Sequence, residues 1–216
     1  MRTGTRIGFA VLALLLGAGL AAHAYDRELN SRQLREAYFL GRDTTFRLEK
    51  FLKDYERELP VPERGVHVSR IAVATPFKEM VDRARLAPDG YNPIKAEQGY
   101  KDDPPLLSVE VTLKLTPGYA AHTPYTIPTF EPVFFRDPDF WREFSFHLVQ
   151  EEEIPPALLV GQPLYSCSID GGCWLTGAVV TVVFDPEKVA SGPARIDVLT
   201  PDGQRVEAEF DLARLR

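Results

Sequence analysis

The chain has 216 residues, of which 26% are charged and 44% are hydrophobic, and its net charge is −6. This length supports one substantial hydrophobic core with room for a small additional element. The acidic balance repels phosphate backbones, so we expect no nucleic-acid partner.

The first 24 residues predict a secretory signal peptide. Arg2 and Arg6 give a positive start, Ile7–Leu20 is an uncharged apolar run, and Ala22 and Ala24 form a small-x-small cleavage signature. Cleavage after Ala24 would leave a mature chain of residues 25–216. The expected location is therefore periplasmic or extracellular.

The apolar run is shorter than the roughly 20 residues that a membrane-spanning helix needs. We therefore expect no membrane contact after the signal is cleaved, and an uncleaved leader that anchors the chain is the alternative. Exported proteins meet oxidising surroundings, in which the two cysteines of this chain can form a disulfide.

Residues 28–59 are helical in pattern. Leu34 and Tyr38 lie on one stripe, Gly41 interrupts the first helical run, and Phe51 and Tyr55 continue a second. The sequence predicts a helical hairpin or one bent helix, which is followed by prolines that stiffen the exit.

The next segment predicts a strand from Val66 to Ala74, in which the alternation slips near Ser69, as a β-bulge would produce. The stretch 77–101 is ambiguous from its pattern. It contains one helix-like apolar set that starts at Phe77, and Asn92-Pro93 is a cap followed by proline at a first helical position.

From Leu107 onward the apolar period changes to two, which indicates half-buried strands. The predicted strands cover 107–115, 140–148, 157–169, 173–184, 194–200 and 205–212. The count of about seven strands and the turn signals between them favour a mainly β fold, an antiparallel immunoglobulin-like sandwich. We assign residues 63–216 to this β-sandwich domain and residues 25–62 to the helical N-terminal segment.

Cys167 and Cys173 predict a disulfide that closes a β-hairpin. A three-residue loop at 169–171 pairs Ser168 with Gly172, and the two cysteines then face each other at the next, non-hydrogen-bonded position. Free thiols or redox chemistry are the alternatives, although the spacing is not Cys-x-x-Cys.

No motif of a common enzyme class occurs in the chain. The sequence lacks a Gly-x-Ser-x-Gly turn, a His-Glu-x-x-His helix and a phosphate-binding glycine loop. We therefore assign no catalytic residue, no metal site and no cofactor, and we expect a protein that is not an enzyme.

One group of side chains supports an alternative, an extracellular hydrolase. Asp137, Asp139 and Glu143 cluster in sequence and could serve as acid and base, together with His122 or His147. This hypothesis requires these groups to meet in one cleft.

The segment 117–141 is the strongest candidate for a contact surface because prolines and aromatic residues alternate along a long loop. Aromatic groups on a stiff loop lose little conformational entropy on binding. The candidate contact residues are Tyr125, Phe130, Phe134, Phe135 and Trp141. The alternative is that these aromatic side chains cover the end of the core.

The sequence thus predicts an exported, disulfide-stabilised binding or assembly module of the cell envelope or extracellular space. A protein or a carbohydrate is the expected partner.

Overall fold

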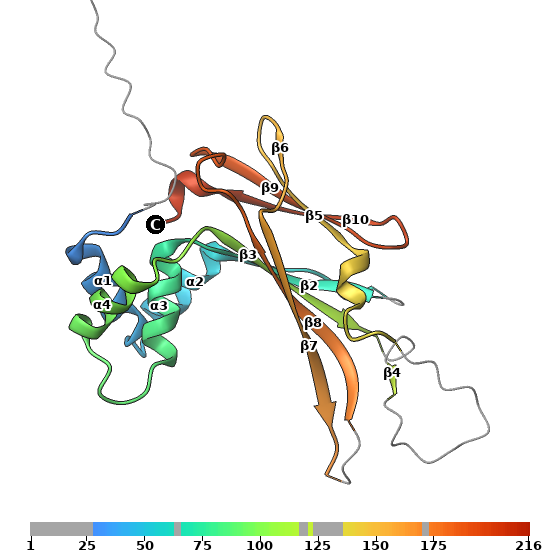
Figure 1. Cartoon of the computed structure of the whole chain (residues 1–216), viewed down its shortest axis with the longest axis horizontal. Coiled ribbons are helices and arrows are strands. Elements are labelled where there is room, and N and C mark those ends of the chain that lie inside the picture. The colour runs from blue at the N-terminus through green and yellow to red at the C-terminus, as the bar shows by residue number, and fades with distance from the viewer. Residues whose placement is uncertain (1–27, 63–65, 117–120, 123–135, 170–172) are drawn as a thin grey trace, which may run out of the picture.

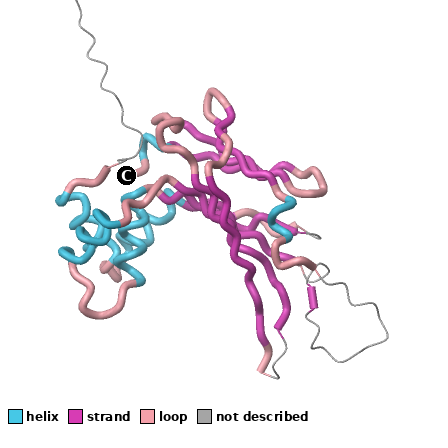
Figure 2. Tube along the Cα trace, in the orientation of Figure 1, coloured by secondary structure: helices cyan, strands magenta, loops and turns pink. Residues whose placement is uncertain are grey.

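The computed structural model describes residues 28–62, 66–116, 121–122, 136–169 and 173–216 (Figure 1). Within them, two antiparallel β-sheets and a group of α-helices form a mainly β structure. Figure 2 shows the helices gathered at one end of the strands.

The larger sheet has six strands in the described part of the chain. Its strands, in spatial order, are β1 (Glu56–Glu58), β2 (Val66–Ala74), β3 (Ser108–Leu115), β8 (Cys173–Val183) and β7 (Leu158–Cys167). The short strand β4 (Ala121–His122) pairs with β8 beyond the end of β3. β8 is therefore bordered along both of its edges.

The smaller sheet has four described strands. They follow the order β10 (Arg205–Asp211), β9 (Pro193–Leu199), β5 (Ser145–Val149) and β6 (Glu153–Ile154). β9 and β10 form a hairpin at the turn that contains Gly203, whose φ of 83° lies in the left-handed region that glycine adopts without strain.

The period-two pattern of the sequence places apolar side chains on one face of each sheet. Val109, Val111 and Leu113 of β3 are buried, whereas the residues between them are partly exposed. The predicted bulge in β2 is confirmed, because the pairing with β3 shifts between Val68 and Arg70.

Four α-helices are present among the described residues, namely α1 (Ser31–Gly41), α2 (Phe46–Tyr55), α3 (Pro76–Leu86) and α4 (Pro93–Asp102). Asn92 accepts hydrogen bonds from the backbone N–H groups of Ile94 and Lys95, so the predicted cap is confirmed. A Cβ on Gly41 would overlap the carbonyl oxygen of Val81, which shows how closely α1 approaches α3.

The helices share a second hydrophobic core. Leu34 and Ala37 of α1, Phe77 and Met80 of α3, and Ala96 of α4 belong to it. The helical part therefore draws on residues beyond 25–62, and residues 56–58 inside that range belong to the larger sheet.

The predicted strand 140–148 was wrong in its first half. Residues Phe140–Glu143 form a 3₁₀-helix, and β5 begins only at Ser145. The side chain of Asp137 accepts a hydrogen bond from the N–H of Asp139, which starts a turn that carries the chain into this 3₁₀-helix.

The main core takes residues from both sheets and from the 3₁₀-helix. The Trp141 side chain is only 5% exposed and lies against Gly161 of β7, where a Cβ would overlap its indole ring. The absence of a side chain at residue 161 therefore makes room for the tryptophan.

Asp197 of β9 is buried and paired with two arginines. Arg195 Nε lies 2.7 Å from Asp197 Oδ1, and Arg205 binds the second carboxylate oxygen. Burial opposes ionisation of Asp197, but the hydrogen bonds from the two guanidinium groups outweigh burial and hold its pKa below the usual value.

We expect Gly161→Ala to lower the free energy of unfolding by about 1–3 kcal/mol, because the new methyl group must displace a buried ring. Chemical denaturation measures this change. The control is Gly99→Ala in α4, where nothing lies near the new Cβ and helix propensity predicts a gain of about 1 kcal/mol. Equal stability of Gly161→Ala and the wild type would contradict the contact.

We expect the contribution of Asp197 to stability to be present above its unfolded-state pKa, about 3.9, and to be lost as pH falls through the lower folded-state pKa. The stability difference between the wild type and Asp197→Asn should thus be largest near neutral pH and should shrink on acidification. Denaturation curves between pH 7 and about pH 2 test this. Asp89→Asn, at an exposed position, should change stability by less than about 0.5 kcal/mol at neutral pH.

Candidate functional site

The most exposed apolar strand in the described part of the chain is β7. Leu158 is 55% exposed, Val160 46% and Tyr165 48%, and Leu159 is also exposed. No charged residue occurs from Leu158 to Ile169, although 26% of the whole chain is charged. Leu158 and Val160 lie on one face of the strand and Leu159 and Tyr165 on the other, so β7 exposes apolar side chains on both faces, as interaction surfaces do.

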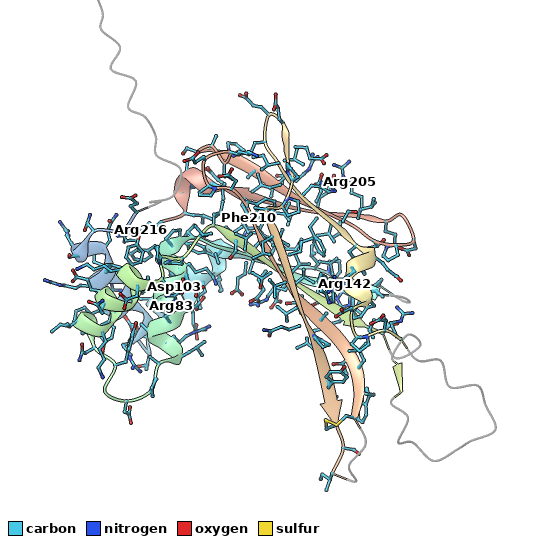
Figure 3. The ribbon with its side chains drawn as sticks, in the orientation of Figure 1. Arg83, Asp103, Arg142, Arg205, Phe210 and Arg216 are labelled. Carbon is cyan, nitrogen blue, oxygen red and sulfur yellow. A yellow bond between two sulfur atoms is a disulfide. The ribbon has the colours of Figure 1, made fainter. Side chains whose placement is uncertain are left out.

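β7 and β8 form a long hairpin. Figure 1 shows it reaching from the body of the molecule, and the disulfide lies near its far end in Figure 3. Among the described residues, β7 pairs with β8 alone, so its other edge carries no strand.

The backbone direction of β7 follows from the ladder on the other side of β8. Phe184, just after β8, donates its N–H to the carbonyl of Leu107, just before β3. Because alternate residues of a strand direct their backbone groups to opposite neighbours, the N–H and C=O groups of Val183 point toward β7, as do those of every second residue before it. Val183 pairs with Leu158, which therefore turns its backbone groups toward β8, as does Val160.

The alternate residues of β7 consequently turn their N–H and C=O groups toward the unpaired edge. These residues are Leu159, Gly161, Pro163 and Tyr165. Pro163 has no N–H to donate, and an outward position is the one at which a strand tolerates proline. The outward donors near the base of the hairpin are thus the N–H groups of Leu159 and Gly161.

Cys167 and Cys173 form the disulfide, and their Cα atoms are 4.0 Å apart. The two residues face each other in the ladder, and the next pair is Ser166 with Trp174, so the predicted register is confirmed. The loop residues 170–172 lie outside the described residues.

Four of the five candidate aromatic contact residues, Tyr125, Phe130, Phe134 and Phe135, lie outside the described residues. The fifth, Trp141, belongs to the main core. The guanidinium of Arg142 stacks over its ring at 4.9 Å from the centroid. The Trp141 side chain thus packs against one face of β7 and exposes little surface to a partner.

Two of the candidate carboxylates share a cavity. Asp137 and Glu143 line a cavity of about 310 Å³, to which Asp202 and Arg136 also contribute. Asp139 is instead paired with Arg142, at 3.0 Å between Oδ2 and Nε.

The structure does not add a histidine to this cavity. The Nδ1 atom of His147 lies 2.7 Å from Glu153 Oε1 in the β5–β6 hairpin, and His147 does not line the cavity. The backbone of His122 belongs to β4, and its side chain lies outside the described residues.

Within the described ranges, no three His, Cys, Asp or Glu side chains are placed to hold a metal ion together. No helix in the same ranges has the length and apolar character needed to cross a membrane.

Comparison with known protein families, with characterised proteins and with solved structures finds no match for this chain.

The sequence predicted a strand at 157–169 but did not indicate that this strand forms a contact surface. The signal that could have found it is the uncharged run from Leu158 to Ile169, which contains proline and ends at a disulfide. Proline in a strand indicates an edge position, and an uncharged edge is exposed to pairing.

We expect the double substitution Cys167→Ser with Cys173→Ser to lower the free energy of unfolding by about 2 kcal/mol, because a seven-residue ring no longer restricts the unfolded chain. Denaturant titration under oxidising conditions measures the loss. An unchanged midpoint and slope would show that the disulfide contributes nothing to global stability.

Proposed function

We propose that this chain is a non-catalytic binding or assembly module of the cell envelope or the extracellular space, and that its partner contacts the β7–β8 hairpin. The observation that carries this proposal is the strand β7, which is exposed and uncharged and which, among the described residues, pairs along only one of its edges.

The physical reason is that a strand with one unpaired edge offers a partner both specificity and affinity. Backbone groups along the edge can receive a further strand, and the alternating side chains of β7 set which partner fits. The exposed side chains at Leu158, Val160 and Tyr165 would lose water-accessible apolar surface on binding, which favours association.

The proposal includes export through the signal peptide at residues 1–24, followed by cleavage. The disulfide between Cys167 and Cys173 supports an oxidising location, since such bonds are rare in the cytosol. Retention of the signal as an anchor is the alternative, and those residues lie outside the described ones.

We also propose that the two sheets pack as an immunoglobulin-like sandwich. The support is a single core to which β2, β3 and β8 of one sheet and β5, β9 and β10 of the other contribute buried side chains.

A protein strand is the partner class that β7 supports best. A carbohydrate partner, or a contact through Tyr125, Phe130, Phe134 and Phe135, remains part of the proposal on sequence grounds alone.

A second candidate function, an extracellular hydrolase, is favoured by the cavity that Asp137 and Glu143 share. Loss of a hydrolytic activity in both Asp137→Asn and Glu143→Gln, with unchanged stability, would support it. No turnover of polysaccharide, ester or peptide substrates by the wild type would count against it.

The binding proposal predicts that Val160→Ser weakens partner capture at least tenfold, because it replaces an exposed apolar side chain of β7 by a polar one. The measurement is crosslinking in the native cells, purification through a C-terminal tag and quantitative mass spectrometry of the chain and its partners.

The matched control is Leu86→Ser, which makes the same kind of change at a residue that is 78% exposed at the end of α3. Capture should be unchanged in this control. Equal capture by the wild type and by Val160→Ser would contradict the proposed surface.

A further inference from the structure

We propose that the partner strand at β7 is β7 of a second copy of this chain, added antiparallel about a two-fold axis at Val160. This inference rests on the proposed function and names the occupant of its surface.

The first step is the pattern of backbone groups. A two-fold axis at Val160 places Leu159 of one copy opposite Gly161 of the other, and the reverse. Both residues turn their N–H and C=O groups outward. Each such pair exchanges two hydrogen bonds, so the four N–H groups of Leu159 and Gly161 in the two copies each meet a carbonyl.

The second step is the position of Pro163. In this register the ladder covers residues 158–162 of each copy, and Leu158 of one copy faces Gln162 of the other. Pro163 lies outside the ladder, so its missing N–H leaves no carbonyl within the ladder unpaired. Proline therefore limits the length of the pairing without preventing it.

The third step is side-chain fit. On the face that carries Trp141, the Leu159 side chain of one copy lies across from Gly161 of the other, where the apolar Trp141 ring fills the space over the glycine. On the opposite face, the two Val160 side chains meet at the axis. A pair of β-branched residues at such a position is favourable.

The distribution of charge permits a second copy to approach at β7. A chain with a net charge of −6 repels itself in general. The strand from Leu158 to Cys167 carries no charged group, so identical strands approach each other without like-charge contacts. Edge strands that must remain single are usually protected by charge, and β7 lacks this protection.

The test uses a new cysteine at the axis. Residues that face each other at a non-hydrogen-bonded antiparallel position have Cα atoms about 4.5 Å apart, within the range of a disulfide. We expect Val160→Cys in the otherwise intact chain to give a covalent dimer on mild oxidation, with peptide mapping locating the bond between the two introduced thiols.

The matched control is Gln162→Cys, on the same strand and the same face. In the proposed register this position faces Leu158 of the second copy, and the two introduced thiols are too far apart to bond. Few or no covalent dimers should form. Equal crosslinking by both variants, or none by Val160→Cys, would overturn the register and with it the proposal.

A second measurement is sedimentation of the unmodified chain. Pairing over five residues buries little surface, so we expect a weak dimer that is visible at on the order of 100 µM protein. We expect Leu159→Pro, which removes an outward N–H and keeps the ladder to β8, to weaken self-association at least tenfold.

The outcomes separate this inference from the proposed function. A chain that stays monomeric, and whose capture of a different protein still falls tenfold in Val160→Ser, would leave the binding function standing and overturn the second copy as occupant. A chain that stays monomeric and whose capture does not depend on Val160 would overturn both.

Discussion

The structure depends on the pairing of β8, because this strand uses its backbone groups on both edges. β3 and β4 occupy one edge of β8 and β7 occupies the other. Since alternate residues of a strand face opposite neighbours, the ladder to β3 dictates which groups of β8 remain for β7. That choice in turn dictates which groups of β7 point away from the sheet. The outward direction of the N–H and C=O groups of Leu159 and Gly161 thus follows from the pairing of β8 with β3.

The hairpin is held at two points. Near its base, Gly161 lets the Trp141 ring pack against the sheet, and at its far end the disulfide joins Cys167 to Cys173. Six of the ten residues of β7 are exposed and the other four are partly buried. An extended strand ordered in this way loses little further conformational entropy when a partner adds to it, which favours binding.

Much of the secondary structure could be predicted from local pattern. The alternation in β3, the bulge near Ser69, the cap at Asn92 and the register of the cysteines each depend on residues that are close in sequence. The 3₁₀-helix at Phe140–Glu143 was missed because the spacing of Phe140 and Phe144 is ambiguous. Two apolar residues four positions apart lie on one face of a helical turn, and they also lie on one face of an alternating strand.

The candidate site was less accessible to sequence reasoning. The position of β7 at an edge depends on the order of strands, which local periodicity does not encode. The contact between Trp141 and Gly161 joins residues of two elements, and nothing near either residue in sequence signals it. The sequence left Trp141 open between a contact surface and a cover over the end of the core, and the structure places it in the core.

Amide hydrogen exchange at single-residue level tests the central claim, that the outward edge of β7 is free in the isolated chain and is occupied in the assembly. The account predicts that Leu158 and Val160 exchange slowly at every protein concentration, because their N–H groups face β8. Leu159 and Gly161 should exchange fast in dilute protein and more slowly as concentration rises. Slow exchange of the Leu159 and Gly161 amides at high dilution would contradict a free edge in the isolated chain. Fast exchange of both amides at all concentrations, and also in the presence of captured partner, would contradict an occupied edge in the assembly.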